Sequence, residues 1–193
     1  MRSRGVTLVE LILVVAVLGV IATLAAPSFR DLIVQQRLNG IQAQLVTDLQ
    51  LARTEAVARQ NWARLVFRST DAMTCYTLFT TVNNANAIRC DCRLGPGLAC
   101  GPQATEIRTV QVPRRQSVTV RMTPGQGISG FAFDHVSGTI ASIPVDNVSV
   151  PLARAMVDVA ASSEQALRVV VNRAGRPSVC SPAGSRMAPP TCE

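Results

Sequence analysis

The N-terminal part of the chain is a long apolar run with a single acid at its head. From Leu11 to Ala26 no residue is charged, and all but one glycine and one threonine are aliphatic. As a helix rising about 1.5 Å per residue, this run and the residues just before it are long enough to cross a bilayer core. The pattern predicts a transmembrane helix over residues 6–27. Glu10 stands out, because a carboxylate in a membrane segment costs free energy and an ordinary anchor has no reason to carry it.

After Pro27 the pattern changes to that of an amphipathic helix. Apolar residues recur every three or four positions, which places them on one face. They are Leu38, Ile41, Leu45, Leu49, Ala52 and Ala56. Residues 28–60 are therefore predicted to lie against a folded domain. The two halves form one helix of about 80 Å, with a kink near Pro27 because proline has no N–H to donate.

From residue 61 onward the pattern is that of β-strands. Short runs rich in strand-forming residues alternate with gaps rich in glycine and proline, as in an antiparallel sheet. The runs are 63–68, 74–82, 106–112, 117–122, 131–139, 156–160 and 167–171. Residues 83–103 are predicted to be an irregular loop that carries cysteines, and residues 182–193 an extended tail. The expected fold class is α+β, with a long N-terminal helix packed on an antiparallel β-domain of residues 61–193.

The charges before the apolar run predict its orientation. Arg2 and Arg4 precede the run, so the positive-inside rule places the N-terminus in the cytoplasm and the β-domain in the periplasm. The β-domain holds all six cysteines: Cys75, Cys90, Cys92, Cys100, Cys180 and Cys192. An even number of cysteines in an exported domain favours disulfides. A zinc site is the alternative, but the paired CxxC spacing is missing and no metal is expected.

One disulfide follows from position along the chain. Cys180 and Cys192 flank a proline-rich loop with 11 residues between them, and we predict that they close the tail. The remaining bridges would form among Cys75, Cys90, Cys92 and Cys100, in a connectivity that the spacing leaves open.

The basic side chains are the main candidate for binding chemistry. The formal charge is +7, and all 19 basic residues are arginine, whose guanidinium binds phosphate and carboxylate through two parallel hydrogen bonds. Near the C-terminus, Arg168, Arg173, Arg176 and Arg186 outnumber the neighbouring acids. Such a patch would contact phosphates without reading sequence. A solvated basic hairpin is the plainer interpretation.

No catalytic constellation is recognisable. His135 is the only histidine and lies in a predicted hairpin, where a surface position is expected. The chain has no Gly-x-Ser-x-Gly, His-Glu-x-x-His or P-loop motif. We therefore predict that the protein is not an enzyme and uses no cofactor. An anchored periplasmic enzyme is the alternative.

The N-terminal segment resembles the signal of type IV pilins and pseudopilins. In that family a short basic leader ends in glycine, a prepilin peptidase cuts after it, and the new N-terminus is methylated. The fifth mature residue is glutamate, and a proline commonly stands at mature position 22. Residues 1–5 would be the leader, cut after Gly5 and methylated on Val6, with Glu10 and Pro27 at those two positions. A secretory signal peptide or a plain anchor does not explain Glu10.

The resemblance implies a role for Glu10 and a set of partners. In the pilin family this glutamate is thought to pair with the charged N-terminus of a neighbouring subunit during filament growth. Glu10 of one molecule would then meet the Val6 amine of another. The partners would be other pilins or pseudopilins, the prepilin peptidase and the inner membrane, and the protein would function by assembly into an envelope filament.

Three later segments resemble the GspH/FimT family of minor pseudopilins. They are residues 49–57, 131–138 and 167–176. Members of that family act in the type II secretion pseudopilus or the type IV pilus, in filament assembly or initiation. Some FimT-like members bind DNA for natural transformation through a Gly-Arg-x-Arg turn. Here Gly175-Arg176-Pro177-Ser178 keeps only the first arginine, so any DNA binding, by Arg173 and Arg176 with help from Arg168 and Arg186, is expected to be weak.

Overall fold

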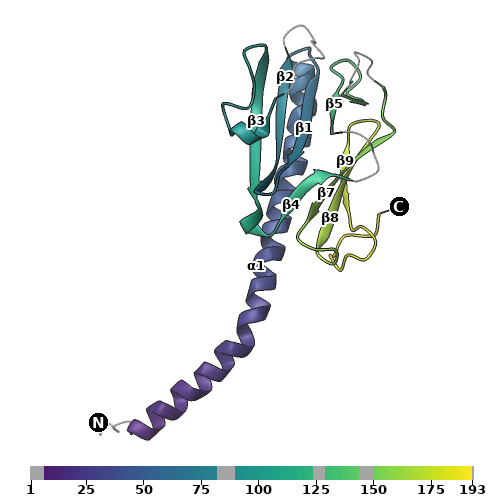
Figure 1. Cartoon of the computed structure of the whole chain (residues 1–193). Coiled ribbons are helices and arrows are strands. Elements are labelled where there is room, and N and C mark those ends of the chain that lie inside the picture. The colour runs from purple at the N-terminus through teal and green to yellow at the C-terminus, as the bar shows by residue number, and fades with distance from the viewer. Residues whose placement is uncertain (1–6, 82–89, 124–128, 144–149, 193) are drawn as a thin grey trace, which may run out of the picture.

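The computed structural model consists of one long helix and two antiparallel sheets (Figure 1). It describes residues 7–81, 90–123, 129–143 and 150–192, and the side chains of residues 24–28 are also left out. The predicted leader, residues 1–5, and the predicted mature N-terminus, Val6, lie outside the described residues. The α+β fold class is confirmed: the helix packs with its upper half on the β-domain and extends below it alone.

The helix α1 (Leu8–Ala58) starts at a side-chain cap. The backbone N–H of Glu10 donates to Oγ1 of Thr7 at 3.3 Å, and Glu10 lies in the first turn, where a negative charge is favourable. The helix continues through residue 27 and curves along its length (Figure 1). Pro27, where the sequence predicts a kink, has its side chain outside the described residues. Within the described part of the chain, no helix is both long and apolar enough to span a membrane.

The strands form two sheets with every neighbouring pair antiparallel. The first has the order β3-β2-β1-β5-β6 and the second the order β4-β7-β8-β9. Their bounds are β1 (Ala63–Ser69), β2 (Met73–Thr81), β3 (Ala104–Pro113), β4 (Thr119–Met122), β5 (Gly130–Phe133), β6 (Ile140–Ser142), β7 (Arg154–Ala160), β8 (Ala166–Asn172) and β9 (Pro177–Cys180). Each predicted run contains a strand. The sequence missed two strands: β6, which follows directly after the run 131–139, and β9, which begins at a proline, a residue that only an edge strand tolerates.

The predicted apolar face of the second half of α1 is buried. Leu38, Leu45, Leu49, Ala52 and Ala56 are fully buried, and Ile41 packs beside them. They meet inward-facing side chains of both sheets, including Phe67, Phe131 and Phe133, whose rings contact one another. The alanines lie near the end of the helix, where large side chains would hold it away from the sheets.

Three disulfides tie the β-domain. Cys180–Cys192 forms as predicted and closes the C-terminal tail. The connectivity that the sequence left open is Cys75–Cys92 and Cys90–Cys100. Cys92 begins a short 3-10 helix, η2 (Cys92–Leu94), in the irregular loop, and its bridge fastens that loop to β2.

A buried acid joins α1 to the first sheet. Asp48 lies on the packed face of α1 and is fully buried; its Oδ2 accepts a hydrogen bond of 2.7 Å from the Tyr76 hydroxyl. Its Oδ1 lies 3.0 Å from Nη1 of Arg108, whose side chain is half exposed. Burial raises the pKa of Asp48 above its ordinary value and outweighs the opposite effect of the two partners. The interaction therefore fixes the position of α1, although it removes the Asp48 carboxylate from water, which costs free energy.

We expect Tyr76→Phe to lower the free energy of unfolding by about 1–3 kcal/mol, because it leaves a buried carboxylate oxygen without its donor. Denaturant unfolding of the two proteins measures this difference. The control is the same change in an Asp48→Asn background. There the loss should be smaller, because the neutral amide costs less to leave unpaired. Equal losses in both backgrounds would show that the loss does not depend on the charge of the carboxylate.

Candidate functional site

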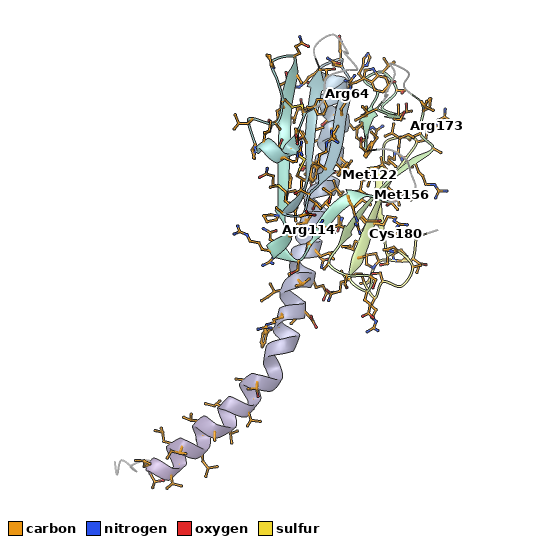
Figure 2. The ribbon with its side chains drawn as sticks, viewed as in Figure 1. Arg64, Arg114, Met122, Met156, Arg173 and Cys180 are labelled. Atoms are coloured by element: carbon orange, nitrogen blue, oxygen red, sulfur yellow. A yellow bond between two sulfur atoms is a disulfide. The ribbon has the colours of Figure 1, made fainter. Side chains whose placement is uncertain are left out.

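The first half of α1 exposes hydrophobic side chains on all sides, and no other described element covers it. Eleven large hydrophobic side chains between Leu8 and Ile21 are between 52% and 74% exposed. Phe29, Leu32 and Ile33 continue this surface toward the domain. Figure 2 shows that these side chains project around the helix and that no other element covers them. An exposed apolar surface of this extent marks a site that lipid or protein covers.

Glu10 is the one charged residue between Thr7 and Phe29. It is exposed, and in the described part of the chain it takes part in no ion pair. Thr7 and Glu10 have the spacing of a capping box, in which the glutamate side chain faces the backbone at the helix start. The sequence did not suggest this cap.

The turn between β8 and β9 carries two of the predicted arginines. Arg173 and Arg176 are exposed and make no ion pair among the described residues. Asn172 closes the turn, with its Oδ1 accepting from the Arg176 N–H at 3.0 Å and its carbonyl accepting from the Gly175 N–H at 2.9 Å. The strand predicted at 167–171 thus leads into the predicted turn.

Gly175 lets this turn lie against the loop between β5 and β6. Its φ is +72°, and a Cβ added there would lie 2.4 Å from the carbonyl oxygen of Gly138. The guanidinium of Arg53, on α1, lies against Gly138 from the other side. A groove of about 370 Å³ between helix and turn is lined by both Arg53 and Arg176. The sequence did not suggest Arg53, because it is far from the turn along the chain.

The other two predicted arginines are not at this edge. Arg168 faces Asp158 on the neighbouring strand and donates to its carboxylate at 2.7 and 3.3 Å. Arg186, in the tail, lies 3.2 Å from Glu164, near the opposite end of β8. The structure therefore does not gather the four arginines of the predicted basic patch in one place. The physical reason is that each of these two arginines has a carboxylate partner that only the folded arrangement of the strands brings near.

His135 does not form part of a catalytic or metal-binding group among the described residues. It is half-buried, and its Nδ1 lies 3.4 Å from Asp134, the preceding residue. Asp134 in turn accepts from the hydroxyl of Ser137 and caps the loop before β6. In the part of the chain that the structure describes, no group of three or more His, Cys, Asp or Glu side chains could hold a metal ion.

Comparison with known families decides what kind of protein this is. Residues 42–175 match the family described as type II transport protein GspH, which is more than half of the chain. The chain belongs to the GspH family of pilin-like proteins. Residues 1–26 match the prokaryotic N-terminal methylation motif. The family is one of minor pilins and pseudopilins, not of enzymes, and the motif implies a membrane-anchored protein of an envelope filament.

Two solved structures are also similar to this GspH-family chain. Both are of the type IV minor pilin FimU of Pseudomonas aeruginosa, in different crystal forms, and both are 14% identical in sequence. One covers 79% of this chain and 90% of FimU with a TM-score of 0.45. The other covers 76% and 89% with a TM-score of 0.43. No curated protein matches the chain.

Proposed function

We propose that this GspH-family protein is a minor pilin or pseudopilin subunit that helps to assemble or initiate a filament. The filament is a type II secretion pseudopilus or a type IV pilus. The observation that carries the proposal is the division of α1: its second half buries one face in the β-domain, whereas its first half exposes hydrophobic side chains on every side. Such a helix needs a second apolar environment, first lipid and then the helices of neighbouring subunits.

The membrane state follows from the N-terminal sequence. Before assembly, residues 6–27 span the inner membrane as a single pass, with Arg2 and Arg4 on the cytoplasmic side and the β-domain in the periplasm. The prepilin peptidase cuts between Gly5 and Val6 and methylates the new amine. The match to the methylation motif supports this step.

Glu10 gives the assembly its register. Once Val6 is the N-terminus, Glu10 is the only charged side chain before Arg30. A carboxylate surrounded by apolar helices is costly unless a cation neutralises it, and the amine of a neighbouring Val6 is a cation at the same depth. A subunit that enters out of register leaves both charges unpaired. The exposed position of Glu10 at the helix start supports this pairing.

The second candidate function is a DNA receptor for natural transformation. Its support is the exposed turn at Asn172–Arg176, which presents Arg173 and Arg176 without a neutralising acid among the described residues. Nothing in the sequence resembles a helix that reads a DNA groove, so binding would involve phosphates alone.

Removal of the leader is the first test. Intact-mass analysis of protein extracted from membranes should show the loss of Met1–Gly5 and the addition of one methyl group. Gly5→Leu should leave the leader in place, because the small residue before the cut is replaced by a large one. Gly19→Leu, a matched change within the apolar run, should not affect cleavage. A mature protein that starts near Ala26 would instead identify a secretory signal peptide.

Neutralising Glu10 is the second test. Glu10→Gln should leave the protein inserted and folded but remove it from filaments, because only the charge is lost; Glu10→Ala should do the same. Glu55→Gln is the matched control, since Glu55 lies on the same helix and pairs only with Arg59 among the described residues. The measurement is co-purification with sheared filaments. Normal incorporation of the Glu10 variants would refute the pairing.

DNA affinity as a function of salt tests the second candidate. If the full chain in detergent binds duplex DNA, replacing Arg173 and Arg176 by alanine should lower the slope of log affinity against log salt by about 0.9 for each phosphate that is no longer neutralised. Replacing Arg59, which is paired with Glu55, is the control and should change the slope little. An absence of binding by the wild-type chain at low salt would remove the receptor function and leave the filament function standing.

A further inference from the structure

A polar cleft on the second sheet is not used by either function. It has a volume of about 480 Å³ and is lined by three arginines, Arg114, Arg121 and Arg168. It lies on the face of the sheet away from the core, since Arg121, Asp158 and Arg168 alternate with buried residues along their strands. Figure 2 labels Arg173, in the turn before β9, and Cys180, at the other end of that strand. The cleft is near the Cys180 end, because Pro182 and Ala183 line it.

The floor of the cleft is a row of charged side chains on three neighbouring strands. Arg121 on β4 is the register partner of Asp158 on β7, which is the partner of Arg168 on β8. Arg168 donates two hydrogen bonds to Asp158 and neutralises it. Arg121 is exposed and forms no ion pair in the described part of the chain. The row therefore has one guanidinium whose donors are free for a ligand.

The walls of the cleft are fixed by bonds of their own. On one side Arg114, in the 3-10 helix η3 (Arg114–Gln116), donates from Nε and Nη2 to the Thr70 carbonyl at 3.3 and 3.1 Å. On the other side the tail contributes Pro182 and Ala183. The Cys180–Cys192 disulfide anchors that tail, and the hydroxyl of Ser185 donates to the Ala166 carbonyl at 2.7 Å.

The rest of the lining consists of small residues. Apart from the charged side chains and Thr119, it is made of alanine, serine and Pro182. Small side chains leave the cleft open, so that a main chain can approach the floor. Three arginines and one aspartate give the lining a net charge of +2, since 3 − 1 = 2.

We propose that this cleft binds an acidic segment of a partner protein, with a glutamate or aspartate carboxylate received by Arg121. Guanidinium and carboxylate match in geometry and make two parallel hydrogen bonds. Asp158 in the floor disfavours the dense charge of a phosphate backbone. The inference rests on the proposed function only in taking the partner to be a protein, and it does not require the partner to be in a filament.

The test uses the full chain in detergent micelles and a fluorescent peptide. The probe is Gly-Glu-Ala-Glu-Gly, with Gly-Gln-Ala-Gln-Gly as the uncharged control, and fluorescence anisotropy at low salt is the measurement. We expect the acidic peptide alone to bind, and Arg121→Gln to weaken it about tenfold, as for the removal of one charge-assisted hydrogen-bonded pair. Arg115→Gln is the matched control, because Arg115 is exposed next to the cleft but does not line it.

Asp158→Asn is a second variant, for which we expect a gain of binding that misfolding would not produce. It removes the only acid of the lining, so the acidic peptide should bind more tightly. No binding by the wild-type chain, or equal losses in Arg121→Gln and Arg115→Gln, overturns the proposal. So does tighter binding of inorganic phosphate or duplex DNA at the same arginine. Because no filament is present, these results are independent of the leader and Glu10 experiments.

Discussion

The burial of a single face of α1 between two sheets is the interaction on which the rest of the structure depends. The helix contacts β1, β2 and β5 of the first sheet and β7, β8 and β9 of the second. Its leucines cover the apolar inner faces of both sheets. Each sheet alone is open on that side, and the helix closes the core by packing against both. The helix is therefore fixed to the domain by its second half only.

The same packing explains why the first half stays bare. A domain can bury an apolar stripe on one side of a helix. It cannot bury a helix that is apolar all round, because the opposite faces need separate partners. The buried pair of Asp48 and Tyr76 adds a directional interaction to otherwise non-directional packing. A shift of α1 along its axis would leave the carboxylate buried without a donor, which costs more than any single apolar contact. The bare half is thus held at a defined distance from the domain.

The sequence predicted what depends on local periodicity. The stripe at Leu38, Leu45 and Leu49 was readable from spacings of three and four residues, and most strands from short runs of strand-forming residues. What depends on register between distant strands was not predictable. The disulfide partners of Cys75 and Cys90, and the pairing of Arg168 with Asp158, are of this kind. β9 was missed for a different reason, since a proline interrupts a strand everywhere except at the edge of a sheet.

The candidate sites also divide into those with a local sequence signal and those without one. Glu10 was predicted from its place in an apolar run. Arg53 and Arg121 have no local signature, and only their neighbours in the folded structure make them candidates.

The distribution of charge removes some arginines from the set of candidates. The protein has 19 basic and 12 acidic side chains, so some arginines must remain without an acid. Several acids are taken by partners close in the chain, as in Arg59 with Glu55, or directly across a strand pair, as in Arg168 with Asp158. Surface ion pairs of this kind contribute little to stability. Their larger effect is to remove some guanidinium groups from competition for a ligand. Arg121, Arg173 and Arg176 have no such partner in the described chain, so their hydrogen-bond donors are available to an external anion at the cleft and at the β8–β9 turn.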